Sequence, residues 1–236
     1  MIIMELKIKS LYKSYKEKKV FEDFSINMKE GVYGLLGPNG SGKSTLMNIL
    51  ALNLIRDKGE ILLNGNDISD LGSNYRRLLG YMPQQQALYD DFSGIEFLTY
   101  MASLKGMNKK IAKEEILYFL DRVELSEYAY FKTKTYSGGM KQRLLLAATL
   151  LANPKVIILD EPTAGLDPKQ RVHIRNLIKD ISKGKIVLIA THVLSDVESI
   201  ADIIVFMKNG KILKEHKQNG QPLETLYMHY FEDEVY

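Results

Sequence analysis

The chain of 236 residues contains no cysteine. This absence excludes a disulfide framework, a zinc site built on cysteine and a catalytic thiol. The sequence also lacks an apolar run near the roughly 18 residues that a membrane-spanning helix needs. Its opening, MIIMELKIK, has no cationic start and no long apolar stretch, so it does not fit a secretion signal. We therefore expect a cytoplasmic protein, and any work at a membrane would need another protein to hold it there.

A strong charge of either sign is missing as well, because the formal net charge is only +3. Lysines and acidic residues are interspersed, and the basic cluster KSYKEKK at 13–19 is short. This balance gives little reason to expect a nucleic-acid partner, and we expect none. The length accommodates one large domain, or a domain with a lobe, but not two such domains.

Alternating strands and helices are predicted along most of the chain. Several of the expected strands are continuously apolar, which indicates a mostly parallel sheet that is covered by helices. Ligands of such sheets bind beyond the carboxyl ends of the strands. Strands are expected at 5–15, 25–29, 31–37, 60–65, 79–83, 155–162 and 184–192, helices at 43–54, 168–182 and 221–231, and a hairpin that turns at Asn209 and Gly210 at 201–216.

The pattern changes between about Gln85 and Thr135. Apolar residues recur there at helical spacing, as at Ile95, Leu98 and Ala102. We predict an all-helical lobe at about 86–135, inserted into a core lobe formed by about 1–85 and 136–217. A short helix and an acidic tail complete the chain at about 218–236.

A glycine-rich segment, GPNGSGKST at 37–45, fits the pattern G-x-x-x-x-G-K-[ST] of a phosphate-binding P-loop. It stands between a predicted strand and a predicted helix, which is the context that such a loop requires. Backbone N–H groups would wrap the phosphates of ATP, Lys43 would reach the β- and γ-phosphates, and the Ser44 hydroxyl would bind Mg²⁺. The predicted ATP-binding residues here are Gly37, Pro38, Asn39, Gly40, Ser41, Gly42, Lys43, Ser44 and Thr45.

The segment VIILDEP at 156–162 places two acids at the end of an apolar strand. Carboxylates directly after a buried strand are costly unless they meet a cation. Asp160 is predicted to hold the Mg²⁺ shell, and Glu161 to act as general base on an attacking water.

A second anion-binding helix start is predicted in TYSGGMKQR at 135–143. The serine and two glycines precede the helix-forming run LLLAATLL, and the free N–H groups of a helix start favour negative charge. One chain would then carry two phosphate-binding helix starts.

Taken in order, these motifs resemble those of the ATP-binding subunit of an ABC transporter, and the resemblance runs from about Leu6 to the final helix. GPNGSGKST is similar to the Walker A loop, YSGGMKQR to the signature motif, and VIILDEP to Walker B with its catalytic glutamate. The resemblance implies an α/β fold: a P-loop NTPase (RecA-like) core with a mostly parallel sheet, an N-terminal antiparallel β subdomain and an inserted α-helical subdomain. All of these would form a single ABC ATPase domain over 1–236.

The resemblance assigns roles to four more residues. Tyr15 would stack on adenine, Gln84 would lie at the Mg²⁺ and the attacking water, Asp167 would belong to the D-loop, and His192 would contact the γ-phosphate. Tyr12 is a rival for the adenine role, and since stacking discriminates bases poorly, GTP stays open as a ligand. Asp167 also suits the N-cap of a helix that starts at Pro168.

The predicted site can be summarised by role. The catalytic residues would be Lys43, Gln84, Glu161 and His192, and the metal ligands Ser44, Gln84 and Asp160. Ser137, Gly138, Gly139 and Asp167 would bind ATP across an interface, because two such domains face each other head to tail in the family. Tyr136 stands where the signature usually has leucine, which could alter the fit of the helix start.

The resemblance also implies the partners. Two copies, as a homodimer or a heterodimer, would close around two ATP molecules and drive a separate integral membrane permease. SGIEFLTYMASLKGM at 93–107, the methionine of SGGMKQR and the short tail resemble export systems for drugs, peptides or lipids. The alternative is an ABC-type ATPase that serves a non-transport membrane complex, in signalling or lipoprotein release.

Overall fold

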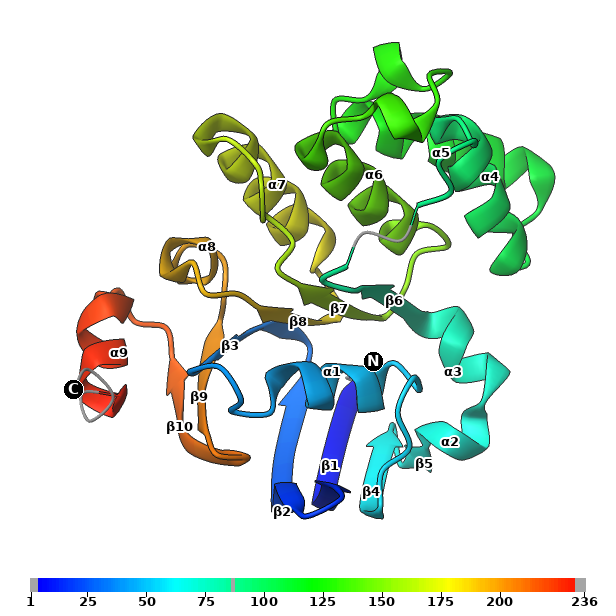
Figure 1. The fold of residues 1–236 in the computed structure, drawn as a ribbon. Helices are drawn as coiled ribbons and strands as arrows, with labels where there is room; N and C mark the ends of the chain where they lie inside the picture. The colour runs from blue at the N-terminus through cyan, green and yellow to red at the C-terminus, as the bar shows by residue number, and fades with distance from the viewer. Residues whose placement is uncertain (1–3, 86–87, 232–236) are drawn as a thin grey trace.

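The larger of two β-sheets is built from the apolar strands. The computed structural model describes residues 4–85 and 88–231 and places six strands in the order β10-β9-β3-β8-β7-β6, of which β10 alone is antiparallel to its neighbour (Figure 1). The strand bounds are β3 Gly31–Leu36, β6 Leu79–Met82, β7 Val156–Asp160, β8 Ile186–Ala190, β9 Ile203–Lys208 and β10 Lys211–Lys217. The mostly parallel sheet is confirmed.

Both faces of this sheet are covered, as continuous apolar strands require. Along β7, Ile157 and Leu159 enter one hydrophobic cluster, whereas Val156 and Ile158 enter another. Helix α1 (Lys43–Leu50) lies on one face, and α6 (Gly138–Leu150), α7 (Pro168–Ile181) and α8 (Leu194–Glu198) lie on the other (Figure 1). The two faces therefore belong to two different cores.

The smaller sheet is antiparallel and holds the first strands of the chain. Its order is β2-β1-β4-β5, with bounds β1 Glu5–Tyr15, β2 Lys18–Lys29, β4 Lys58–Leu63 and β5 Asn66–Asp67. The strand predicted at 25–29 in fact begins at Lys18. Phe21 and Phe24 are both buried although they are three residues apart, because the chain passes through a positive φ at Asp23. That irregularity breaks the alternation by which a strand is recognised in a sequence.

The helix predicted at 43–54 ends four residues early, at Leu50. Leu52 has a φ of 58°, which a helix cannot accommodate, yet its side chain packs against the core. The predicted helix was too long because apolar residues that pack on the core continue in the sequence beyond its last turn. The short helices α2 (Ile68–Leu71), α3 (Ser73–Leu78) and α8 were not predicted, because none is long enough to show a helical period.

The segment 88–135 is helical. It contains α4 (Gly94–Leu104), α5 (Lys109–Arg122) and the 3₁₀ turns η1 (Ser126–Tyr128) and η2 (Thr133–Thr135). Ser93 and Glu96 form a capping box that starts α4. Helix α6 packs against α4, α5 and β6, so the helix that begins with YSGG connects this segment to the sheet.

The end of the described chain forms a hairpin and a helix. Asn209 and Gly210 turn the β9–β10 hairpin with φ values of 49° and 71°, as predicted from their identity. Helix α9 (Leu223–Phe231) packs on β9, where the Tyr230 and Phe206 rings lie 4.7 Å apart. The predicted acidic tail lies outside the described residues. Within those residues, no helix combines the length and apolar character needed to cross a membrane.

Candidate active site

Four neighbouring parallel strands end at the same edge of the larger sheet. Strand β3 runs into the glycine-rich loop, and β7 ends at Asp160. Gln84 follows β6, and Thr191 and His192 follow β8. Because the strands are parallel, the sheet brings segments that are distant in sequence to one place.

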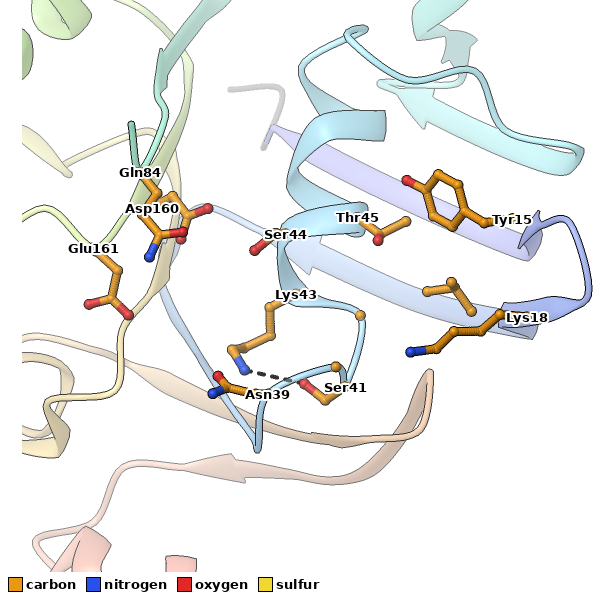
Figure 2. Close-up of a pocket in the computed structure, with 13 residues that line it drawn as sticks. Tyr15, Lys18, Asn39, Ser41, Lys43, Ser44, Thr45, Gln84, Asp160 and Glu161 are labelled. Carbon is orange, nitrogen blue, oxygen red and sulfur yellow. Dashed lines mark hydrogen bonds between the residues drawn. The ribbon is translucent and has the colours of Figure 1, made fainter. Parts of the chain in front are cut away.

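A cavity of about 270 Å³ opens at this edge (Figure 2). It brings together most of the residues that the sequence assigns to nucleotide and metal. The lining is formed by Tyr15, Lys18, Val20, Asn39, Gly40, Ser41, Gly42, Lys43, Ser44, Thr45, Gln84, Asp160 and Glu161. Gly37 and Pro38 do not line it, and their carbonyl groups instead accept hydrogen bonds from Lys43.

The loop can enter helix α1 only through glycine at position 42. Gly42 has a φ of 107°, and a Cβ there would lie 2.9 Å from the ring of Phe21. No side chain among the described residues caps the start of α1. The N–H groups of the first turn are therefore available to an anion such as a phosphate.

Lys43 extends into the loop that precedes it. Its Nζ donates to the carbonyl oxygens of Gly37 at 2.6 Å and Pro38 at 3.0 Å and to Ser41 Oγ at 3.3 Å. Burial lowers the pKa of Lys43, and the nearby carboxylates of Glu161 and Asp160 partly offset this. A phosphate in the loop would compensate the same ammonium charge more fully than neutral carbonyl groups do.

Asp160 is almost fully buried, at 6% exposure. Burial raises its pKa, Glu161 raises it further, and Lys43 and a hydrogen bond with Ser44 act in the opposite direction. The Asp160 carboxylate, the Ser44 hydroxyl and the Gln84 amide offer oxygen atoms to one cavity. Mg²⁺ prefers such hard oxygen ligands, few of them carboxylates and the rest from phosphates and water, so these residues fit the ion.

Glu161 is held from several sides. It has a φ of 53°, which is unusual for a residue other than glycine. Its carboxylate accepts hydrogen bonds from Thr191 Oγ1 at 3.1 Å and from the backbone N–H of His192 at 3.1 Å. The Nδ1 atom of His192 lies 2.8 Å from the same carboxylate, while 79% of the imidazole side chain remains exposed. His192 thus reaches the site through Glu161 and does not line the cavity.

The second helix start lies apart from this cavity. Ser137 caps α6 by accepting a hydrogen bond from the Met140 N–H at 3.2 Å, and Ser137 and Gly138 are exposed. Neither these two residues nor Gly139 or Asp167 belongs to the cavity lining. Asp167 accepts from the Gln170 N–H at 2.8 Å and caps α7, so the predicted N-cap is confirmed.

Tyr136, which replaces the usual leucine, is buried at 5% exposure. Its hydroxyl donates to the carbonyl oxygen of Tyr128 at 2.6 Å. A Cβ at Gly94 would overlap this hydroxyl, so glycine at the start of α4 makes room for it. The substitution adds a polar bond to the helical segment and leaves Ser137 in position to cap α6.

Two lining residues were missed by the sequence analysis. Lys18 and Val20 reach the cavity because the β1–β2 hairpin pairs Tyr15 with Lys18. A turn at Lys16 and Glu17 would have predicted this hairpin, but the two residues stand within the basic cluster KSYKEKK and do not show a turn pattern. Tyr15 lines the cavity with 47% exposure, whereas Tyr12 does not line it.

Comparison with known sequences identifies a family. Residues 21–164 match the profile described as ABC transporter. The chain is 42% identical over 222 residues to the uncharacterized ABC transporter ATP-binding protein YxlF of Bacillus subtilis, covering 92% of this chain and 74% of that protein. It is 37% identical over 227 residues to the lantibiotic transport ATP-binding protein SrtF of Streptococcus pyogenes, covering 94% and 95% of the two chains.

Solved structures agree with the sequences. A structure described as the ATP-binding subunit of an ABC transporter superposes with a TM-score of 0.87 at 27% identity, over 95% of this chain and 98% of that one. The cassette MJ0796, as a dimer in a post-hydrolysis state with ADP and Pi, gives a TM-score of 0.81 at 29% identity, over 91% and 99%. The P-loop at the edge of a parallel sheet, the family profile and these relatives agree: the chain belongs to the ABC transporter family, as an ATP-binding protein.

Proposed function

We propose that this protein binds ATP with Mg²⁺ in the cavity of Figure 2 and hydrolyses it. Tyr15 stacks on the base, the loop 37–45 wraps the phosphates, and Lys43 neutralises the β- and γ-phosphates. Ser44, Asp160 and Gln84 would hold the ion, which would supply charge neutralisation on the transferred phosphoryl group. Glu161 takes the proton of the attacking water, and His192, which is bonded to Glu161, contacts the γ-phosphate.

The two phosphate-binding helix starts are separated in the chain, and this separation supports an ATP site shared between two copies. The start of α1 lines the cavity, whereas Ser137 and Gly138 at the start of α6 are exposed outside it. An exposed helix start with two glycines, outside the cavity that holds the P-loop, suits a ligand that another copy holds. We infer that two chains, identical or different, close head to tail around two ATP molecules. Ser137, Gly138, Gly139 and Asp167 then act across the interface.

Trapping a closed dimer tests this arrangement. Glu161→Gln keeps the shape of the side chain but removes the base, so the variant should bind ATP and form a stable dimer in light scattering. Adding Ser137→Arg should abolish that dimer and leave ATP binding to the monomer intact. A Glu161→Gln variant that hydrolyses ATP at the wild-type rate would contradict the role of Glu161. An ATP-dependent dimer that survives Ser137→Arg would contradict the composite site.

The helical segment offers a surface for a membrane partner. A groove of about 700 Å³ runs along α4. Its lining combines apolar and aromatic side chains with polar residues and two acids, namely Asp91, Phe92, Ile95, Glu96, Thr99, Tyr100 and Ser103. In the sequence, Asp91 of this groove follows Gln84 of the cavity by seven residues. We propose that it docks a separate integral membrane permease, which would hold the protein at the cytoplasmic face and be driven by closure and opening of the dimer.

Export of a drug, peptide or lipid is the transport that we propose. The name of SrtF supports this, since that relative serves lantibiotic transport. A signalling or lipoprotein-releasing membrane complex is the alternative. Affinity purification of tagged Glu161→Gln with ATP from solubilised membranes should recover a polytopic permease. Recovery of a sensor or a lipoprotein-releasing complex in its place would favour the alternative.

A further inference from the structure

Gln142 connects the signature helix to the catalytic strand end of the same chain. The residue lies on α6 and is 1% exposed. Its Nε2 donates a hydrogen bond of 2.6 Å to the backbone carbonyl oxygen of Glu161. A buried side-chain amide that bonds a backbone group fixes the distance between two elements.

The backbone of Glu161 needs such support. A left-handed conformation is unfavourable for a residue with a side chain, and it persists only where neighbouring groups hold it in place. The Glu161 N–H bonds the carbonyl of Ala190 at 2.8 Å, and its carbonyl also accepts from the Ala164 N–H at 3.1 Å. These two bonds come from β8 and from the turn that follows Glu161. Gln142 adds the bond from α6.

The next residue on α6, Arg143, contacts the helical segment and not the ATP site. Arg143 is also buried, at 6% exposure, and donates to the carbonyl oxygens of Val123 at 2.6 Å and Glu124 at 3.0 Å, at the end of α5. Two consecutive buried side chains thus connect α6 to the ATP site on one side and to the helical segment on the other. Helix α6 cannot shift without moving one of these contacts.

We propose that Gln142 is a positioning residue for Glu161. Its bond to the Glu161 backbone ties that residue to the helix whose N-cap, Ser137, lies five positions earlier, or about 7.5 Å along the axis. The proposal rests on the function proposed above. If Ser137 contacts ATP in the partner's site, then α6 carries that contact directly to the Glu161 of its own chain. In each chain, contact of Ser137 with the ATP that the partner binds would thereby hold the general base Glu161 in place.

Replacing the amide tests the proposal against a purely structural role. Gln142→Met keeps the volume and removes the donor, and Gln142→Glu, which is closer in shape, serves as a second variant if the first does not fold. The matched control is Thr149→Val. Thr149 is also buried on α6, and its hydroxyl lies 2.8 Å from Leu145 O and 3.4 Å from Tyr81 O, with no bond to Glu161. Each variant is measured for kcat and KM of ATP hydrolysis and for melting temperature.

A displaced base should slow chemistry without weakening substrate binding. We expect Gln142→Met to lower kcat by about 10- to 100-fold with KM within about twofold, since a misplacement of an ångström can cost that much. Thr149→Val should lower the melting temperature about as much as Gln142→Met does, but it should leave kcat unchanged. Added to Glu161→Gln, Gln142→Met should not lower the residual rate further, because both changes act on one group.

The results separate failure of this inference from failure of the proposed function. A wild-type kcat for Gln142→Met, or an equal fractional loss in the wild-type and Glu161→Gln backgrounds, would overturn the positioning role alone. Undiminished hydrolysis by Glu161→Gln would instead overturn the proposed function on which the inference rests.

Discussion

The two glycine-led helix starts, of α1 and α6, share a composition and differ in their surroundings. At α1 the N-cap is Gly42 with a φ of 107°, and the first turn faces a cavity that the same chain encloses. At α6 the N-cap is Ser137, whose own side chain satisfies one N–H of the turn, and the position is exposed. The start of α1 can therefore enclose an anion within its own chain, whereas the start of α6 is exposed to solvent.

The charges around the two helix starts differ in the same way. Lys43 at α1 faces the cavity with Asp160 and Glu161 nearby, so the site can balance a phosphate and a metal ion. At α6, Lys141 points toward Asp90 at 4.0 Å, and Arg143 is buried against backbone carbonyls of the helical segment. The cations of α6 are thus engaged within the chain, and what this helix start offers is mainly its backbone.

Removing the cation of the first helix start should have the largest effect. Lys43→Ala should weaken ATP binding to the monomer by about 100-fold, because charge-assisted bonds to phosphate contribute about 1.5–3 kcal/mol each. Ser137→Arg should leave the same affinity unchanged. Titration calorimetry with ATP and Mg²⁺ makes the comparison, and equal losses in the two variants would refute the division of roles.

A matched pair of glycine substitutions sharpens the contrast. Gly42→Ala should lower the free energy of unfolding by about 2 kcal/mol, since alanine is strained at positive φ and its Cβ would press on Phe21. A Cβ at Gly138 meets no described atom within 4 Å, so Gly138→Ala should be neutral or stabilising by up to about 1 kcal/mol. Urea denaturation of the two variants measures both values. If the two substitutions lowered the free energy of unfolding by similar amounts, position 138 would be packed against its own chain and not open to a partner.

The charge of the first site should itself reduce stability when no ligand is bound. The pKa of Asp160 is raised by burial, so the folded state disfavours its ionised form. Below the pKa of about 3.8 that Asp160 has in the unfolded chain, its carboxyl group is protonated in both states and does not destabilise the fold. As the pH rises through the higher pKa of the folded state, the buried carboxylate ionises and the free energy of unfolding falls. Asp160→Asn should therefore raise the melting temperature of the ligand-free protein by a few degrees at neutral pH, with the gain vanishing below about pH 3.8.

The periphery of the first site should matter least. Lys18 is exposed at the rim of the cavity, where solvent screens its charge. Lys18→Ala should raise the KM for ATP by no more than about fivefold and leave kcat unchanged. Steady-state kinetics would detect a larger effect, and a fall in kcat would place Lys18 among the groups that act on the reacting phosphate.

Much of the first site was predictable because its groups follow one another in sequence. GPNGSGKST and VIILDEP each carry their chemistry within a few residues, at the ends of strands whose apolar character is plain. Lys18 was not predictable, because a hairpin brings it to the cavity. The start of β2 was missed for a related reason, since the irregularity at Asp23 removes the alternation on which strand prediction depends.

The long-range bonds of Glu161 could not be predicted. No spacing in the sequence says that Gln142 reaches the carbonyl of Glu161, or that His192 Nδ1 lies 2.8 Å from its carboxylate. These bonds depend on how α6 and β8 pack beside β7. Likewise, Tyr136 was evident as a departure from the family pattern, but its bond to Tyr128 and its need for Gly94 follow from the packing of the helical segment.

Complementation between two damaged chains tests the composite site most directly. Lys43→Ala damages the cavity, and Ser137→Ala damages the second helix start. In a mixed dimer both lesions fall on one ATP site, and the other site has an intact P-loop and an intact signature. We predict that a mixture of the two variants hydrolyses ATP faster than the average of the two measured separately. A mixed rate equal to that average would contradict the claim that each ATP lies between two chains.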